Sequence, residues 1–397
     1  MQENLTREEL QDRLTRFRSL MTQTHPDWNT AFILSRINQY YFTGTMQDGM
    51  LVIKREADQP FYFVRRSYER AMAESPLSCV YPMNSYRDAA AALGGACGHT
   101  SMETEIVTIG ILNRLRKYFE LGEVHSLDRV MQAVRAVKSP YELDWMRRAG
   151  KAHQAFLEDV VPTLLREGVS EADFIAGLYA SMVRYGHQGI SRFAMFQTEM
   201  VAGQVAFGEN SLYPTSFDGP GGAKGLCPAV PLLGSRERRL RKGDLVFVDI
   251  GFGMSGYHSD KTQVYQFGGH PTAETVRAHR QCIEVQARTA ALLKPGAVPA
   301  EVYQTVMNEL SEDFKRNFMG FGQRRAAFLG HGIGLQVDEP PVIADGFREP
   351  LKEHMTIALE PKKGIPGVGM VGVEDTYIVT PDGGLCITGG GREIIAL

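Results

Sequence analysis

Isolated acidic residues stand in or beside apolar, strand-like runs in the second half of the chain. Asp249 interrupts the run 245–250, Glu360 follows the run 357–359, and Glu374 stands in a third such segment. Alternate side chains of a β-strand share a face, so an acid in an apolar run lies among buried neighbours. A buried carboxylate without a cation is costly. These positions therefore require a fold that brings cations to buried acids.

A fourth acid, Asp260, begins the strand-like segment that follows Asp249. Gly253 and Gly256 provide the turn between the two segments. An antiparallel pair of strands joined in this way can place Asp249 and Asp260 side by side. An alternative for these two residues alone is that one Asp caps a turn and the other pairs with an Arg or Lys.

His331 stands between Gly330 and Gly332, where the bare backbone permits close approach to a ligand or an ion. By itself, such a histidine can also be an incidental loop residue. Four acids and one imidazole make a ligand set that suits manganese, iron(II) or cobalt better than a structural zinc site. Acids in a cluster repel one another unless cations neutralise them, which two divalent ions would do. The sequence therefore predicts a carboxylate-rich metal centre.

The chain divides into two predicted domains. Ser139-Pro140-Tyr141-Glu142 places a serine cap, a proline at the first helical position and a glutamate at the third, so a long helix begins there. Before it, short apolar runs alternate with helical stretches, which indicates an α/β unit. We predict an N-terminal α/β domain at 1–130 and a second domain at 131–397. In the second domain, single strands are predicted over about 355–362 and 371–379.

Composition and charge exclude several classes of protein. The chain has 397 residues, 43 Lys+Arg against 46 Asp+Glu and no block of like charges, so it offers no basic face for nucleic acid or anionic lipid. A run of about 18 apolar residues, as a membrane span needs, does not occur. The five cysteines are scattered and form no Cys-x-x-Cys pair, which argues against disulfides and a thiolate zinc site. We expect a cytoplasmic protein with no nucleic-acid or membrane partner.

Five short segments follow one another in the second domain. They are Asp-Ile-Gly at 249–251, Gly-Tyr-x-Ser-Asp-x-Thr at 256–262, Gly-His-Gly-Ile-Gly-Leu at 330–335, Leu-Glu-Pro at 359–361, and Val-Glu-Asp-Thr-x-x-Val-Thr at 373–380. Together they resemble the pita-bread metallopeptidases: methionine aminopeptidase, aminopeptidase P, prolidase and creatinase. The resemblance implies an α+β fold in which residues 131–397 form a curved antiparallel sheet flanked by helices. Residues 1–130 resemble the smaller creatinase-type N-terminal domain, notably at 38–44.

The resemblance also implies roles for the five candidate ligands. Asp249 would bind one metal ion and His331 the other, while Asp260 and Glu374 would bridge both ions. Glu360 would bind metal and act as general base on the water that bridges the ions. The implied cofactor is a pair of divalent ions, with manganese favoured over cobalt, iron or zinc. The implied enzyme is an Xaa-Pro aminopeptidase or Xaa-Pro dipeptidase that acts on small peptides as a homodimer.

Two departures from the family pattern concern histidines that contact substrate. The family's peptidases usually carry one such histidine upstream of the first Asp ligand, but no histidine lies between His187 and His258. They usually carry a second one seven residues after the ligand histidine, where this chain has Asp338. A neutral imidazole can donate a hydrogen bond to substrate, whereas an ionised aspartate only accepts. Asp338 is therefore predicted to select cationic substrates. The alternative is that an Arg or a backbone amide holds Asp338 outside the pocket.

His258 and His354 are candidate substitutes for the missing histidines, although solvent-exposed or structural roles suit them better. The departures also leave two other functions open. One is a pita-bread enzyme that acts on a small non-peptide substrate, as a C–N hydrolase or a lyase. The other is a non-catalytic binding module, which the retention of all five ligands disfavours.

Overall fold

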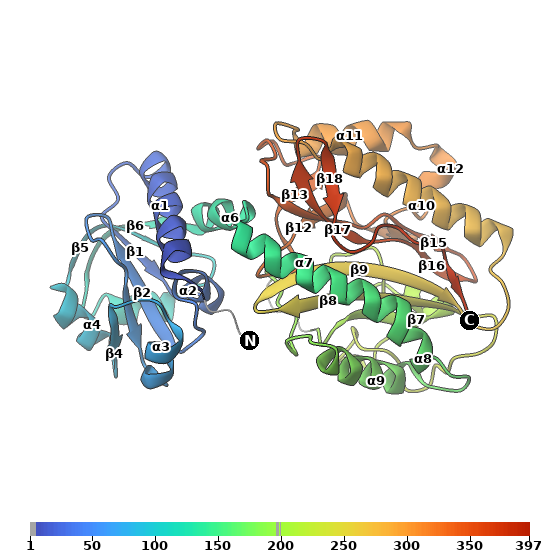
Figure 1. The fold of residues 1–397 in the computed structure, drawn as a ribbon, viewed down its shortest axis with the longest axis horizontal. Helices are drawn as coiled ribbons and strands as arrows, with labels where there is room; N and C mark the ends of the chain where they lie inside the picture. Colours follow the sequence, from blue (N-terminus) through green and yellow to red (C-terminus); the bar gives the residue numbers. More distant parts are fainter. Residues whose placement is uncertain (1–4, 196–197, 199) are drawn as a thin grey trace. The chain divides into compact units, whose positions relative to one another are not determined.

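The computed structural model describes residues 5–195, 198 and 200–397. It consists of two compact units, Met1–Arg135 and Ala136–Leu397, which we call the N-terminal unit and the C-terminal unit (Figure 1). Within the described residues, none of the helices combines the length and the apolar character that a membrane span requires.

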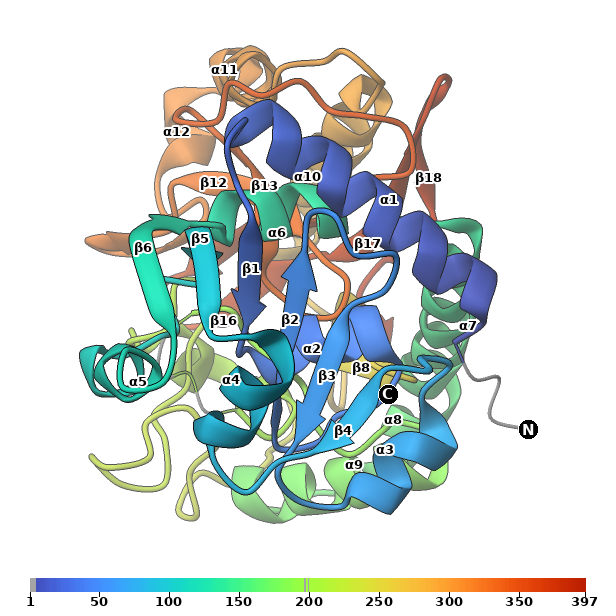
Figure 2. The same ribbon diagram turned by 90° about the vertical axis from the view of Figure 1, so that its left-hand side faces the viewer.

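The N-terminal unit contains a six-stranded mixed sheet in the order β4-β3-β2-β1-β5-β6, which faces the viewer in Figure 2. Its strands are β1 (Thr30–Ile33), β2 (Gly49–Lys54), β3 (Phe61–Val64), β4 (Val80–Pro82), β5 (Ala96–Met102) and β6 (Glu120–Ser126). Its helices are α1 (Arg7–Thr24), α2 (Arg36–Thr43), α3 (Tyr68–Glu74), α4 (Tyr86–Leu93), α5 (Ile109–Leu115) and α6 (Asp128–Ala136). The alternation of strands and helices is the α/β pattern that the sequence predicts.

The C-terminal unit begins with the long helix predicted at Ser139. The Ser139 side chain accepts a hydrogen bond from the Glu142 backbone N–H, and the Glu142 carboxylate accepts one from the Ser139 N–H, so the capping box is complete. The helices of this unit are α7 (Pro140–Ala155), the π-helix η1 (Phe156–Val160), α8 (Val161–Leu164), α9 (Glu171–Arg184), the 3₁₀-helix η2 (Gly208–Leu212), α10 (Ala273–Leu292), α11 (Pro299–Glu309) and α12 (Glu312–Lys315).

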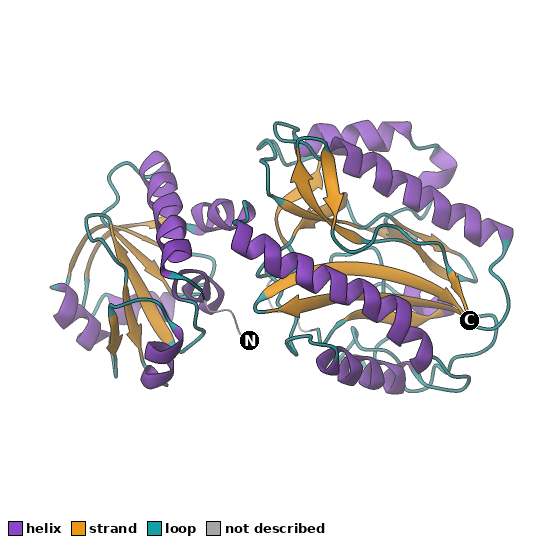
Figure 3. Ribbon diagram, viewed as in Figure 1, coloured by secondary structure: helices purple, strands orange, loops and turns teal. Residues whose placement is uncertain are grey.

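Two main sheets form the centre of the C-terminal unit, with helices flanking them (Figure 3). The first has the order β19-β9-β8-β7, with β7 (Gly203–Phe207), β8 (Leu245–Met254), β9 (Tyr257–Gln266) and β19 (Ile395–Ala396). The second has the order β13-β12-β14-β17-β18, with β12 (Phe328–Gly332), β13 (Glu339–Ala344), β14 (Thr356–Leu359), β17 (Asp375–Thr380) and β18 (Gly383–Cys386). Two-stranded hairpins are β10 (Gly320–Phe321) with β11 (Arg324–Arg325), and β15 (Lys362–Ile365) with β16 (Gly369–Gly372).

Each main sheet has its own helical cover and its own apolar core. Helix α7 packs on β8 and β9, and α9 packs on β7, around a core that includes Phe156, Leu178 and Val246. Helix α10 packs on β14 and β18 and on the β15–β16 hairpin, and the core on that side includes Ile343 and Ile357. The C-terminal unit is therefore built from two packed halves.

The two halves meet where β9 passes β17. Thr262 of β9 forms an isolated antiparallel bridge with Glu374, and its backbone N–H donates to the Glu374 carbonyl at 3.2 Å. The Asp260 backbone N–H donates to the Thr376 hydroxyl at 2.9 Å, and that hydroxyl donates to the Asp260 carbonyl at 3.0 Å. These contacts fix the relative position of two acidic residues from different sheets.

The single strands predicted at 355–362 and 371–379 are both wrong, because each is interrupted. Strand β14 ends at Leu359 and β15 begins at Lys362, so that Glu360 and Pro361 lie in the break. Proline has no N–H to give to a ladder. Strand β16 ends at Gly372, whose φ of 130° lies in a region that L side chains rarely adopt. Glu360 and Glu374 therefore stand at strand ends, where a side chain can turn toward a shared point.

Candidate metal centre

The five residues predicted as metal ligands line one cavity of about 480 Å³ in the C-terminal unit. Asp249 lies on β8, Asp260 on β9 and His331 on β12. Glu360 follows β14, and Glu374 precedes β17. Both halves of the unit therefore contribute, and the structure brings the whole predicted set together.

Asp249 and Asp260 share a face of the β8–β9 pair. The two strands are antiparallel, with Asp249 opposite Thr262 and Gly251 opposite Asp260. The two acids are thus diagonal neighbours two positions apart on the same face. Both faces of β8 are buried around Asp249: Phe247 shares its face, Val246 and Val248 lie on the opposite face, and all three are fully buried.

His331 reaches the cavity because its neighbours lack side chains. On β12 it pairs with Ala358 of β14, and a Cβ on Gly330 would lie 2.1 Å from the Ala358 carbonyl oxygen, so only glycine allows this pairing. The ring Nδ1 lies 3.1 Å from the Gly332 carbonyl oxygen. An N–H at Nδ1 that donates to this carbonyl leaves Nε2 free to bind a cation.

Three of the five residues form a cluster that fits a divalent ion. Ligand atoms of Asp260, His331 and Glu374 lie within 4.8 Å of one another. His331 Nε2 lies 3.8 Å from Glu374 Oε1, which is buried and accepts no hydrogen bond from the described residues. A buried oxygen without a partner is costly, and a bound cation would satisfy it. Two carboxylates and one imidazole are a donor set that a divalent transition-metal ion accepts.

Lys362 occupies the other side of the carboxylate cluster. Its Nζ donates to Asp249 Oδ2 at 2.9 Å, to Glu360 Oε2 at 2.9 Å and to Glu374 Oε2 at 2.7 Å. The lysine side chain is fully buried. Sequence reasoning missed this residue. The signal was its spacing, since Lys362 comes two positions after Glu360 in an extended segment, and residues i and i+2 of such a segment share a face.

Burial and mutual repulsion dominate the electrostatics of the acids. Burial, together with the charge of Glu374, raises the pKa of Asp249 to about 7, although the Lys362 ammonium opposes the shift. Burial and the charges of Glu374 and Asp249 raise the pKa of Asp260 well above its ordinary value. Acids with raised pKa values retain a proton more readily, and a bound divalent cation that displaced the proton would stabilise the charged carboxylates.

The two cationic side chains respond in the opposite direction. Burial lowers the pKa of His331, but its hydrogen bond to Glu360 and the nearby carboxylate charges outweigh burial and raise that pKa to about 10. Burial likewise lowers the pKa of Lys362, and the charges of Asp249, Glu360 and Glu374 raise it to a net value well above the ordinary one. The raised pKa values therefore favour the charged form of both side chains beside these carboxylates.

Asp338 and the two histidines proposed as substitutes, His258 and His354, lie in different places. Asp338 lines the cavity, and its two carboxylate oxygens accept the backbone N–H groups of Ala194 at 2.5 Å and Met195 at 3.2 Å. His258 does not line the cavity and is buried, with Nδ1 3.0 Å from the Gly334 carbonyl oxygen. His354 is 46% exposed and also lies outside the cavity lining.

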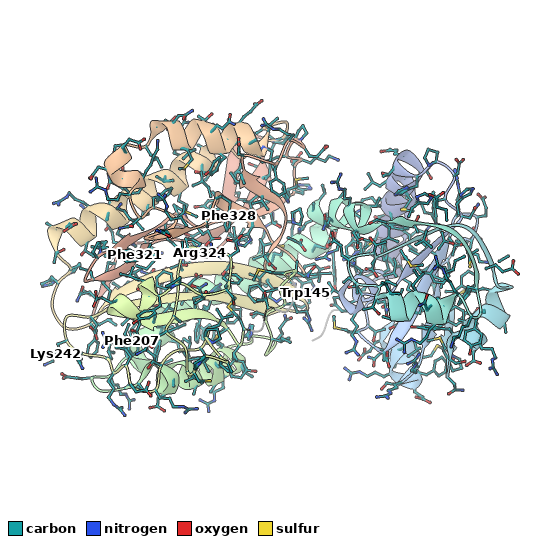
Figure 4. All side chains as sticks on the ribbon, turned by 180° about the vertical axis from the view of Figure 1, so that it is seen from behind. Trp145, Phe207, Lys242, Phe321, Arg324 and Phe328 are labelled. Carbon is teal, nitrogen blue, oxygen red and sulfur yellow. The ribbon has the colours of Figure 1, made fainter. Side chains whose placement is uncertain are left out.

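The remaining walls of the cavity are largely apolar, and hydrogen bonds from Arg324 hold one of them in place. Apolar side chains that line it include Phe193, Met195, Met200, Phe217, Phe328, Val337, Val342 and Phe347. Figure 4 shows Arg324 and Phe328, which lie on β11 and at the start of β12. The Arg324 guanidinium donates to the Phe217 carbonyl at 2.7 Å and to the Asp218 carboxylate at 3.2 Å, so it holds a wall-forming loop.

A buried ion pair lies directly behind two of the candidate ligands. Lys261 Nζ donates to Asp375 Oδ1 at 2.6 Å, and both side chains are at most 1% exposed. Lys261 follows Asp260, and Asp375 follows Glu374. Because neighbouring residues of a strand point to opposite faces, the pair links β9 to β17 on the side away from the cavity.

Two family models match the chain. The model of metallopeptidase family M24 matches residues 144–381, and the model of the creatinase/prolidase N-terminal domain matches residues 13–137. Among similar sequences, an Xaa-Pro dipeptidase of Pyrococcus horikoshii is 26% identical over 374 residues, which cover 92% of this chain and 94% of that protein.

Solved structures of similar fold cover nearly the whole chain. The prolidase from Pyrococcus horikoshii is 24% identical, with a TM-score of 0.78 over 97% of this chain and 100% of that chain. The X-Pro aminopeptidase from Thermotoga maritima is 20% identical, with a TM-score of 0.76 over 93% of this chain and 98% of that chain. At these identities the likeness concerns the fold.

Proposed function

The chain belongs to metallopeptidase family M24, which confirms the predicted family and fold, and from this premise we propose that it hydrolyses the peptide bond before proline in short peptides. It would act as an Xaa-Pro dipeptidase or an Xaa-Pro aminopeptidase. One observation carries the proposal: Asp249, Asp260, His331, Glu360 and Glu374 line a single cavity. The similarity to the Xaa-Pro dipeptidase of Pyrococcus horikoshii supports this substrate class.

Asp260, His331 and Glu374 are the residues that would hold a divalent ion. When bound, such an ion polarises the scissile carbonyl and lowers the pKa of the attacking water. We favour manganese, because carboxylate oxygens dominate the donor set and a single imidazole completes it. Glu360 would accept the proton of that water, since its Oε1 lies 3.4 Å from His331 Nε2 and thus beside the metal ligands.

The cavity would bind a short peptide beside the candidate metal ligands. A volume of about 480 Å³ lies within the range of small-molecule sites, and apolar walls suit a proline ring and a second side chain. Selection of cationic substrates by Asp338 stays a prediction, as does a catalytic part for His258. Both carboxylate oxygens of Asp338 already accept backbone N–H groups, which favours a positioning role for it.

The domain roles, the assembly and the compartment complete the proposal. Residues 1–130 would form the N-terminal domain and 131–397 the catalytic domain, and the division of the fold between Arg135 and Ala136 supports this. All five cysteines are free thiols, which supports a reducing cytoplasm. A homodimer is proposed from the creatinase-type resemblance of the N-terminal domain.

Hydrolysis of Xaa-Pro peptides tests the proposal. Protein loaded with Mn²⁺ should cleave Xaa-Pro dipeptides or longer Xaa-Pro peptides and should lose this activity on chelation. A Glu360→Gln variant should retain folded structure but turn over at least about 10²-fold more slowly, because its amide accepts no proton. No cleavage of any Xaa-Pro peptide by the metal-loaded chain would contradict the proposal.

A second function is favoured by one observation. Among the described residues that line the cavity, His331 is the only histidine, so the cavity offers no second imidazole for a substrate carbonyl. The alternative is hydrolysis of a C–N bond, or a lyase reaction, in a small non-peptide substrate. Metal-dependent turnover of small amides together with inert Xaa-Pro peptides would support this alternative.

A further inference from the structure

Three carboxylates of the predicted ligand set, those of Asp249, Glu360 and Glu374, accept hydrogen bonds from one ammonium group, that of Lys362. We propose that Lys362 permanently takes the place of the second cation, so that the centre binds one divalent ion per chain and not two. The single ion would lie on Asp260, His331 and Glu374. The inference deepens the proposed function and rests on it only for the position of that ion.

The backbone directs Lys362 into the cluster. Glu360 and Lys362 flank Pro361, and Lys362 Nζ donates to Glu360 Oε2 at 2.9 Å, so their side chains lie on the same side of the chain. Lys362 pairs with Gly372 on the neighbouring strand, and a Cβ on Gly372 would lie 2.6 Å from Lys362 Cα and 3.0 Å from its Cγ. The glycine therefore provides the space that the lysine stem occupies.

The ammonium group has no freedom to leave or to serve another partner. Its side chain is 0% exposed, and its Nζ lies 5.8 Å from the centroid of the Phe247 ring. An ammonium has three N–H donors, and Asp249, Glu360 and Glu374 accept all three. Lys362 therefore compensates charge and has no donor left for a substrate.

A second ion would compete for the oxygens that the lysine already holds. By the family resemblance, Asp249 would bind the ion that does not touch His331, and Glu374 would contribute to both ions of a dinuclear centre. In this chain Asp249 Oδ2 and Glu374 Oε2 both accept from Lys362 Nζ, at 2.9 Å and 2.7 Å. A divalent ion on the same oxygens would stand beside the ammonium and be repelled by it.

The two sides of the cluster differ in the way this inference requires. Glu374 Oε2 is held by Lys362, whereas Glu374 Oε1 faces His331 and has no hydrogen-bond partner among the described residues. Asp260 and His331 supply the other ligand atoms of the cluster around Oε1. The two oxygens of Glu374 thus differ, because Oε2 accepts from the Lys362 ammonium while Oε1 faces His331 and Asp260.

Metal stoichiometry tests the inference directly. The full chain is dialysed against excess Mn²⁺, freed of unbound metal and analysed for Mn per chain by plasma mass spectrometry. Electron paramagnetic resonance then distinguishes an isolated Mn²⁺ from an exchange-coupled pair. We expect one isolated ion in the wild type, and two coupled ions in Lys362→Met, which keeps the length of the side chain and removes its charge.

Two further variants serve as controls. Lys363→Met removes the neighbouring lysine, whose Nζ donates to the Phe314 carbonyl outside the cluster, and should bind one ion. Lys362→Arg keeps a positive charge and should also bind at most one ion. The wild-type measurement stands by itself if Lys362→Met fails to fold.

The possible outcomes distinguish failure of the single-ion inference from failure of the proposed peptidase function. Two coupled ions in the wild type would overturn the inference and leave the proposed peptidase function intact. One ion in both wild type and folded Lys362→Met would also overturn it. One ion in the wild type, with two in Lys362→Met but no cleavage of Xaa-Pro peptides, would support the inference and refute the proposed substrate. No bound ion in the wild type would refute the ligand assignment on which both depend.

Discussion

Removal of the charge on Lys261 should destabilise the C-terminal unit strongly while leaving every candidate ligand in the chain. The Lys261→Met variant keeps the aliphatic stem but leaves Asp375 as a buried carboxylate without its cation. The pair is at most 1% exposed, with a separation of 2.6 Å. Solvent therefore cannot replace the lost partner, in contrast to a surface ion pair.

The expected loss follows from this burial. Removing one partner of a buried ion pair costs about 3–5 kcal/mol. For a unit of this size, each kcal/mol lowers the melting temperature by about 2–4 °C, so the fall should be roughly 6–20 °C. In Lys261→Met/Asp375→Asn neither side chain is charged, and this double variant should recover a large part of the loss.

Tryptophan fluorescence during urea unfolding provides the assay. The chain has two tryptophans, Trp28 in the N-terminal unit and Trp145 in the C-terminal unit. Trp145 reports on the affected unit when Trp28→Phe is present in the parent and in all variants. A loss below about 1 kcal/mol in Lys261→Met, or a double variant whose loss equals the sum of the two single losses, would refute the reasoning.

Three further predictions concern a buried histidine, a glycine beside the ligands and the acid in the cavity wall. Burial lowers the pKa of His187 to about 4, and its Nδ1 accepts the Gly253 N–H. The neutral His187 side chain contributes fully to the free energy of unfolding above pH 6.5, and about 3 kcal/mol of that free energy is lost as the pH falls toward 4, because the unfolded chain binds the proton more readily. The difference in unfolding free energy between wild type and His187→Gln should therefore shrink over that range. Gly330→Ala should weaken Mn²⁺ binding at least about tenfold by calorimetry, because its Cβ would press on the Ala358 carbonyl; unchanged affinity would contradict this close approach. Asp338→His should shift kcat/KM toward dipeptides with a free carboxylate over their amides, and identical ratios in both proteins would show that Asp338 does not contact the substrate end.

Local chemistry explains why much of the fold and the ligand set was predictable. The capping box at Ser139 needs only four consecutive residues, and the structure contains it as expected. The buried acids were recognisable because a carboxylate in an apolar run demands a distant partner, whichever partner the fold supplies. Their convergence in one cavity depended on strand pairing, which the order of the family motifs already implied.

The identity of the partner was not predictable from those acids. Lys362 contacts residues 113, 2 and 12 positions away, and only the folded sheets bring Asp249 beside it. Asp338 posed the same difficulty, because its partners lie in the segment at Ala194 and Met195, 144 and 143 positions earlier. The predicted strands failed at Glu360 and Glu374 because an apolar run indicates a strand without marking where a proline or a left-handed glycine ends its ladder.

The contacts of Lys362 affect how the chain folds before it binds metal. Many small metalloproteins fold only when their metal ions bind, and chelators then unfold them. Here a cation that is part of the polypeptide meets Asp249, Glu360 and Glu374 as soon as the sheets form. It cannot dissociate, exchange or be scavenged, and its occupancy does not vary with metal supply. A newly synthesised chain can therefore complete this core during metal starvation and await its ion as a folded protein.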